Sequence, residues 1–443
     1  MKLVKEKFNY LFSDLDMIAG LQTTTTVNNT THKVVLPFYF YAALSFLAGN
    51  FILVFSVEAF TQHYFHQHIL AITHIMALGW GTMMIFGASH QLVPVLIEGN
   101  LYSIRMAWLT FILAAIGIPL LVYGFYHFNM GIPAKWGGRF VLLAVMLYVV
   151  NIVLSVVRSH ARNVHTIFIL AASFWLFLTA FFGLILVYNF TFPILTGDIL
   201  KYIPLHAHVG IIGWFLLLVI GVGAKLIPMF MISKYSNNRL LWLIFALING
   251  GLLLFIFLFF MAPNGKAYFI PLGMIILSIV FFIFYCYKSY TGRIRKNVDT
   301  PMQVSLLSVL MMLLPVLVLI SVSGLYLSGA ENSRMAIIYG FVIFSGWITA
   351  MILGMTFKTL PFIVWNKVYH QKAGVEKTPN PKDLFSGSLF LIMSVIYLTG
   401  FLGFIAGVYL NVISILQGAS ILLFVAALLY FGNVVKVLFH KPG

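Results

Sequence analysis

The sequence predicts an all-α, polytopic membrane protein, and three observations support this fold class. Of the 443 residues, 62% are apolar and 8% are charged, whereas a soluble protein carries about 25% charged residues. The mean hydropathy of +1.03 places most of the chain against hydrocarbon rather than water. Twelve apolar runs are each long enough to cross a bilayer, which takes about 20 residues per helix. Together these features exclude an ordinary soluble fold.

The twelve runs follow one another with short connections. The longest connection, residues 366–385, contains two prolines and mixed charge, which is typical of a loop rather than of a soluble domain. We therefore expect one membrane domain over residues 35–435, between a polar N-terminal segment (1–34) and a short tail (436–443). The expected spans are 35–60, 69–97, 104–127, 137–157, 165–190, 204–232, 240–261, 267–287, 303–327, 335–365, 386–409 and 411–435.

The basic residues predict the orientation of these spans. The chain has 26 Lys and Arg against 10 Asp and Glu, a net charge of +16. With the N-terminus inside, 19 basic residues fall in cytoplasmic segments and 5 in outer loops, which is a clear positive-inside bias over short loops. We expect both termini in the cytoplasm and no nucleic-acid partner. The single Cys286 excludes an intramolecular disulfide.

A repeat of Gly-Trp, Gly and Pro at fixed intervals occurs three times. Its leading residues are His74, His208 and Phe341, and the copies span 74–94, 208–228 and 341–361. The leading residues are separated by 134 and 133 positions, which corresponds to four helices. The repeat therefore predicts three pseudo-threefold units of four helices rather than two halves of six.

Thirteen His residues stand out in this apolar composition, and seven of them fall toward the outer side. His74 and His208 hold the same place in two copies of the repeat, so we expect them at equal depth, each facing a neighbouring unit. Imidazole binds haem (heme) iron, copper and zinc, which makes both residues candidate axial ligands. His206 is a third candidate, although its offset of two residues points it to another side of the helix. Alternatively, these rings bond carbonyls or water at the helix mouths.

A second cluster of His residues lies in the first outer loop. His63, His66 and His68 lie within six residues and are candidate ligands of copper or zinc; the alternative is an interfacial belt of polar rings. Glu58, shortly before them, is a candidate proton or metal partner or a solvated helix end. The six remaining His residues fall at cytoplasmic ends, where solvation accounts for them: His32, His90, His160, His165, His370 and His440.

Two lysines fall inside the expected spans. Lys225 and Lys358, like Gln91, stand three residues before the repeated Pro. A long Lys side chain near a helix end reaches the interface by snorkelling. The alternative is a proton or ion path through these groups.

The repeat and its histidines resemble subunit I of the haem-copper oxidase superfamily, nearest to the cbb-type oxidase and nitric oxide reductase branch. Residues 73–95 resemble the low-spin haem helix of that family, which implies His74 as a haem ligand. His206-Ala207-His208 resembles its His-x-His helix, which carries ligands of both haems, whereas its place as the sixth helix implies a copper ligand. Both roles therefore stay open. The resemblance also implies a bacterial inner membrane, contact with the lipid bilayer, and respiratory or electron-donor partner subunits.

The departures from that family are as informative as the likeness. Tyr339 and Phe341 stand on the tenth helix where the family has its His pair, and residues 239–261 contain no His where the family has two copper ligands. We therefore expect an incomplete oxygen-reducing centre, with Met335, Met351 or Met355 as alternative axial ligands. The chain is also similar, more loosely, to NnrS-type membrane proteins, which contain haem and copper and are associated with the response to nitric oxide.

Three functions follow from the sequence. The first is a divergent oxidase-like protein that binds haem, copper or both near the outer face and serves nitric oxide, haem or metal handling. The second is a working cytochrome oxidase or nitric oxide reductase subunit with unusual ligands, which would be an enzyme of electron transport. The third is a membrane transporter without a cofactor.

Overall fold

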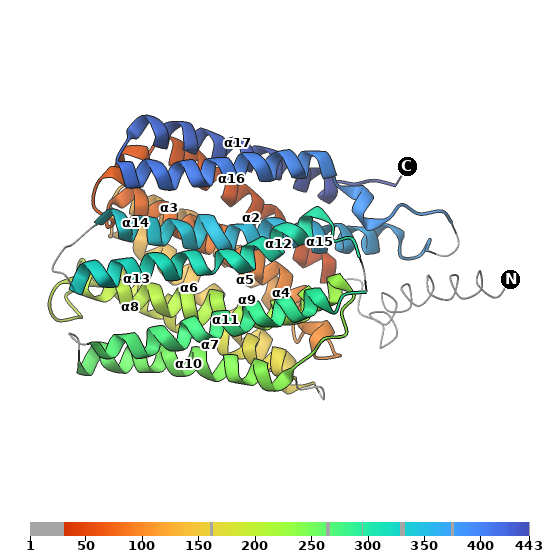
Figure 1. Cartoon of the computed structure of the whole chain (residues 1–443), viewed down its shortest axis with the longest axis horizontal. Helices are drawn as coiled ribbons and strands as arrows, with labels where there is room; N and C mark the ends of the chain where they lie inside the picture. The colour runs from red at the N-terminus through yellow and green to blue at the C-terminus, as the bar shows by residue number, and fades with distance from the viewer. Residues whose placement is uncertain are drawn as a thin grey trace.

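The described chain is a bundle of membrane-spanning helices. The computed structural model describes residues 31–159, 163–262, 266–294, 296–327, 333–373 and 376–442, so nearly all of the expected N-terminal segment, 1–34, lies outside the described residues. Within them the chain forms helices and turns, without a β-strand (Figure 1). Twelve of these helices are long and apolar enough to cross a membrane. The prediction of an all-α integral membrane protein is therefore confirmed.

The observed helices agree with the expected spans to within a few residues at most ends. The first helix is an exception, because it ends at Val54 and the chain then forms a 3-10 turn, Val57–Thr61, with a buried Phe60. The helices are α2 (Thr31–Val54), α3 (Gln67–His74), α4 (Met83–Leu96), α5 (Ile104–Tyr126), α6 (Ile132–Val157), α7 (Val164–Asn189), α8 (Ile203–His208), α9 (Leu217–Met231), α10 (Asn238–Met261), α11 (Phe269–Thr291), α12 (Thr300–Met311), α13 (Leu313–Leu327), α14 (Ser333–Phe341), α15 (Thr349–Tyr369), α16 (Gly387–Leu410) and α17 (Ile413–Leu438).

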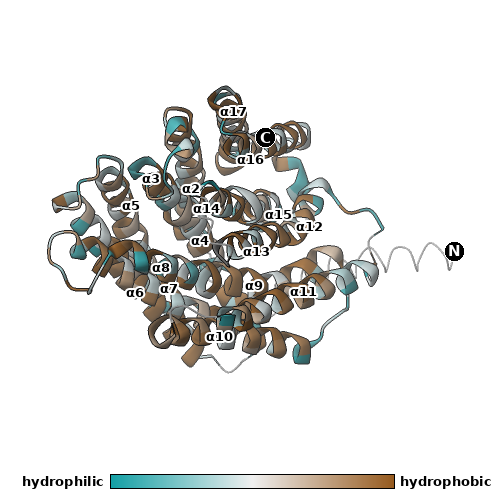
Figure 2. Ribbon diagram, turned by 60° about the vertical axis from the view of Figure 1, so that its left-hand side comes forward, coloured by the Kyte–Doolittle hydropathy of each residue, from teal (hydrophilic) through white to brown (hydrophobic). Residues whose placement is uncertain are grey.

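The outer surface of the bundle is apolar along the helices. Figure 2 shows brown, hydrophobic residues along the helices and teal, hydrophilic residues gathered in the connections at their ends. Large side chains such as Leu253, Phe257 and Val395 are more than half exposed. Because such a large apolar surface would be unfavourable in water, this surface contacts lipid.

The three repeat-bearing helices form the centre of the molecule. In the most apolar part of each of these spans, Gln67–Leu96, Ile199–Met231 and Ser333–Tyr369, 72% of the residues are buried, against 28–50% in the other nine spans. Each also changes to a π-helix directly after the leading residue of the repeat. These π-helical segments are Ile75–Thr82, Val209–Leu216 and Val342–Ile348.

The second Gly of each repeat copy lets the central helix approach the helix before it. A Cβ atom on Gly87 would lie 2.8 Å from the Cβ of Phe38 on α2. In the other two copies a Cβ would collide with the preceding helix in the same way, Gly221 with Phe168 on α7 and Gly354 with Ser305 on α12. Small residues at these crossings permit the close packing that stabilises helices in a bilayer.

Two hydrogen bonds between a Trp and a Thr connect the central helices to one another. Trp80 Nε1 donates to Thr349 Oγ1 at 3.0 Å, and Trp214 Nε1 donates to Thr82 Oγ1 at 3.1 Å. In both bonds the acceptor lies two residues after the Trp of another repeat copy. The corresponding position after Trp214 is Leu216, whose side chain offers no acceptor.

Candidate functional site

His74 is the last residue of α3, immediately before a π-helical segment. Its Nδ1 lies 2.8 Å from the carbonyl oxygen of Leu70, one turn earlier. A carbonyl only accepts, so Nδ1 carries the proton and Nε2 of the neutral ring keeps its lone pair. Fixing the ring through one nitrogen in this way is the usual arrangement of a His that binds a metal through the other. At 1.5 Å per residue, the ring lies about 10 Å inside the span that begins at Gln67.

The structure pairs His74 with His206 of α8. The centroids of the two rings are 6.4 Å apart and their planes differ by 14°. The ring of His206 packs against Gly183 of α7, where a Cβ atom would lie 2.7 Å from His206 Cε1. His206 Nδ1 is buried, and among the described residues it makes no hydrogen bond of normal geometry, although the backbone of Thr179 lies near the ring. A buried nitrogen that is poorly satisfied is costly, which makes His206 a candidate ligand.

The spacing of these two rings fits axial coordination of one metal ion. Two ring nitrogens, each about 2 Å from a central ion, with a ring radius of about 1.2 Å, place the ring centroids about 6.3 Å apart. The observed separation is 6.4 Å, and the rings are almost parallel. The distance between the His74 and His206 rings therefore matches the one that two imidazoles on a single haem iron would have.

The partner of His208 is Tyr339, which lies just before the next repeat copy. Its Nδ1 bonds the carbonyl oxygen of Pro204 at 2.7 Å, which repeats the arrangement of His74, but its Nε2 lies 3.2 Å from the hydroxyl of Tyr339 on α14. Because Nδ1 carries the proton of the neutral ring, Tyr339 is the donor. The two rings are 5.8 Å apart.

The two pairs share one register. His74 and His208 are leading residues of the repeat, and their partners, His206 and Tyr339, each lie two residues before the next leading residue. The third leading residue is Phe341, which stacks on Phe404 at 4.4 Å. Polar pairs therefore occur at two of the three leading positions of the repeat, and an apolar stack occurs at the third.

The histidines of the loop between the first two spans lie near one another without converging. The rings of His66 and His68 are 5.0 Å apart and nearly perpendicular. His66 Nδ1 accepts a hydrogen bond from the backbone of His68 and caps α3, and burial lowers the pKa of His66. His63 and Glu58 are exposed. Within the described residues, no three His, Cys, Asp or Glu side chains gather closely enough to hold a metal ion, and the metal site expected at His63, His66 and His68 stays a prediction.

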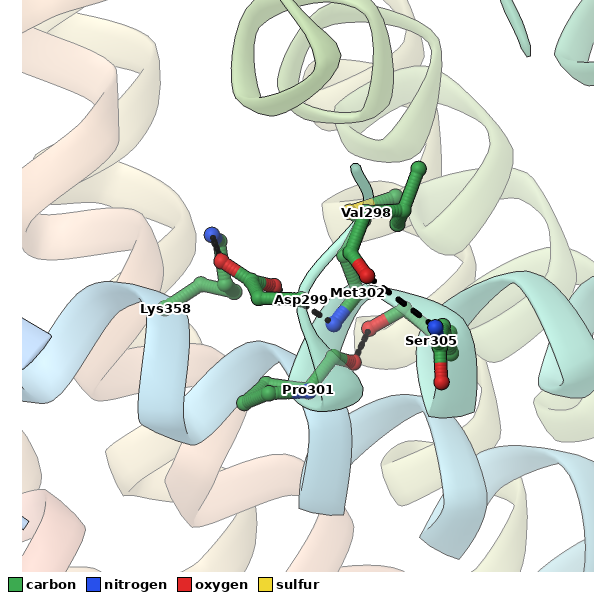
Figure 3. A network of polar contacts seen from close by, with 7 residues as sticks. Val298, Asp299, Pro301, Met302, Ser305 and Lys358 are labelled. Carbon is green, nitrogen blue, oxygen red and sulfur yellow. Dashed lines mark hydrogen bonds and ion pairs between the residues drawn. The ribbon is translucent and has the colours of Figure 1, made fainter. Parts of the chain in front are cut away.

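The two intramembrane lysines differ in environment. Lys225 is exposed. The Lys358 side chain is 11% exposed, and its Nζ lies 2.6 Å from Asp299 Oδ2 (Figure 3). The other carboxylate oxygen of Asp299 accepts from the backbone of Met302 and caps α12. Lys358 thus joins α15 to the start of α12, a contact for which its position before Pro361 gave no signal.

Two histidines expected in solvated positions are inside the bundle. His90 on α4 is 0% exposed, and neither ring nitrogen has a hydrogen-bond partner among the described residues. His165 bonds the carbonyl of Gly221 at 2.8 Å. The expectation of solvation was wrong for His90, because the neighbouring helices still cover the central helix α4 at this position.

Sequence reasoning missed Gly183 and Asp299. Gly183 lies outside the repeat, and its role depends on where the ring of His206 falls. Asp299, followed by Thr and Pro, carries a recognisable helix-start signal, although its contact with Lys358 could not be derived from it.

A groove of about 400 Å³ opens on the lipid-facing side between α2 and α5. Tyr41, Ser45, Ile75, Val122 and Tyr126 are among its lining residues. His74 and His206 do not line this groove, which is separate from the pair.

Comparison of the sequence with protein-family models gives no match, and no curated protein matches it.

Proposed function

We propose that this chain is an integral membrane protein that binds haem, copper or both near its outer face, on a scaffold like subunit I of the haem-copper oxidases. The observation that carries this proposal is the His74–His206 pair, with 6.4 Å between ring centroids and 14° between planes. His74 is held through Nδ1, and His206 has a buried nitrogen without a hydrogen bond of normal geometry among the described residues. In this proposal the two residues would hold the iron of a bound haem.

The scaffold in this proposal consists of three units of four helices, and each unit contributes one of the central helices. Three features support it. In each repeat copy the leading residue is followed by the same π-helical change. Each second Gly meets the helix that precedes the central one. The Trp–Thr hydrogen bonds join different copies through equivalent positions. The basic residues of the sequence support cytoplasmic termini in this arrangement.

The proposed role is the handling of nitric oxide, haem or metal rather than oxygen reduction. The seventh span, α10, contains no His. The tenth span, Ser333–Tyr369, has Tyr339 and Phe341 in place of a His pair. A bound haem supplies ligand binding or electron transfer. His74 and His206 would fill both axial positions, so this pair favours electron transfer or haem carriage.

Haem binding is tested on protein purified in detergent from cells supplied with a haem precursor. We expect a Soret band that is lost in His74→Ala and in His206→Ala, whereas His208→Ala retains it, as does His127→Ala at the end of α5. A band that survives loss of His206 but not of His208 would refute the pairing. Protein with neither haem nor copper would leave the cofactor-free transporter, and consumption of oxygen or nitric oxide with an electron donor would indicate a working reductase.

A further inference from the structure

Helix α6 presents a regular stripe of exposed residues to lipid, and one of them is charged. The stripe consists of Ile132, Trp136, Arg139, Leu143, Met146, Val150, Val153 and Val157. These positions recur every three or four residues, which is the spacing of one helix face. Arg139 is the charged member of the stripe. A cation that faces the membrane is costly unless it reaches the headgroups or a partner.

The depth of Arg139 corresponds to the headgroup boundary. The 26 residues of α6 extend over about 39 Å at about 1.5 Å per residue, which is close to the thickness of a bilayer with its headgroups. Arg139 stands seven positions after Ile132, about 10 Å from the start of the helix. Its guanidinium is therefore within reach of the phosphate groups of one leaflet.

A second cation and a tyrosine of α7 lie beside Arg139. The Arg139 guanidinium donates a hydrogen bond to the Tyr188 hydroxyl and lies 4.5 Å from the ring centroid of Trp136. Lys135 Nζ lies 5.1 Å from the ring centroid of Tyr188 and 4.8 Å from that of Phe192. Since the Arg139 guanidinium is 5.5 Å from the same Tyr188 ring, both positive charges gather around one tyrosine.

The charge of this cluster is not balanced within the protein. Lys135 and Arg139 are four residues apart on one helix, where like charges repel each other. Among the described residues, neither cation forms an ion pair with an Asp or Glu. The Tyr188 hydroxyl accepts from Arg139, so its own proton is available to donate. Two cations and one hydroxyl are thus placed together without an anion.

We propose that Lys135, Arg139 and Tyr188 bind the phosphate group of an anionic phospholipid in the leaflet at this end of the bundle. A guanidinium pairs with two phosphate oxygens at once, and basic clusters at a membrane boundary attract anionic lipids. The surroundings favour a lipid over a free phosphate ion. Trp136 is a residue type of the headgroup region, and Leu143 continues the stripe toward the bilayer centre, where acyl chains would lie against α6.

The test is native mass spectrometry of the full chain, delipidated in detergent and titrated with dioleoyl phosphatidylglycerol, dioleoyl phosphatidylcholine or inorganic phosphate. We expect phosphatidylglycerol to bind most tightly, because it combines a phosphate with a net negative charge. Arg139→Gln and Lys135→Gln should each weaken its binding about fivefold, the loss typical of one basic residue at an anionic membrane surface. Tyr188→Phe should weaken it less, because a neutral donor is lost.

Lys266→Gln is the matched control. Lys266 is also exposed and begins the eighth span at the same end of the bundle, but it is not part of the proposed site, so this variant should bind phosphatidylglycerol like the parent. Equal binding of the two lipids by the parent, or equal losses in Lys266→Gln and Arg139→Gln, would overturn the proposal. Displacement of phosphatidylglycerol by an equal concentration of inorganic phosphate would also contradict it, because the ligand would then be a free anion. No variant changes His74 or His206, so the Soret band tests haem binding separately.

Discussion

The hydrogen bond between Trp214 and Thr82 allows a quantitative test of how the central helices are held together. The donor and acceptor are 3.1 Å apart, and Trp214 and Thr82 are 1% and 4% exposed. Thr82→Val replaces the hydroxyl with a methyl group of similar size and leaves the indole N–H without its acceptor. An unpaired buried donor costs about 1–3 kcal/mol, and double-mutant cycles in a membrane protein average about 0.6 kcal/mol. We expect a coupling energy between Trp214 and Thr82 of about 0.6 to 3 kcal/mol.

The assay is equilibrium unfolding in mixed micelles at rising dodecyl sulfate fraction, followed by circular dichroism. Thr82→Val, Trp214→Phe and the double variant complete the cycle. Thr110→Val is the control, because the Thr110 hydroxyl is buried and lacks a hydrogen-bond partner among the described residues, so its removal should be neutral or stabilising. A coupling energy near zero, or equal losses at both threonines, would refute the reasoning.

The remaining predictions concern the ends of the bundle and the His pair. Lys358→Met removes the ion pair with Asp299, whose side chain is 36% exposed, and should lower the free energy of unfolding by at most about 1 kcal/mol; adding Asp299→Asn should cause little further change that depends on this pair in the same assay. Gly183→Val occupies the space of the His206 ring and should reduce bound haem severalfold in absorption spectra; an unchanged haem content would contradict the packing. His66 accepts in its neutral form and its folded pKa is lowered by burial, so the cap of α3 is present above pH 6.5 and is lost as pH falls through the folded pKa. Hydrogen exchange of the first α3 amides, corrected for the intrinsic rate, should show this loss in the parent and not in His66→Asn.

Most of the fold could be predicted from the sequence because a bilayer imposes simple rules. Every spanning segment must satisfy its own backbone and face hydrocarbon, so long apolar runs identify the helices to within a few residues. The first helix shows the limit of this rule. Its apolar run continues through residues 55–60, but the chain turns after Val54, and Phe60 is buried in the 3-10 turn rather than in the span.

The pairing of the site residues could not be predicted, because it depends on how neighbouring central helices are shifted relative to each other. The repeat relates His74 to His208, and equivalence alone suggests that these two residues face a common centre. In the structure the two leading His residues instead meet the residue two positions before the next leading residue, in the pairs His74–His206 and His208–Tyr339. A π-helical segment follows both leading His residues and adds backbone length that an ideal 3.6-residue period does not describe. Tyr339 stands two residues before Phe341, as His206 stands two residues before His208. A comparison of the leading residues alone would therefore miss Tyr339.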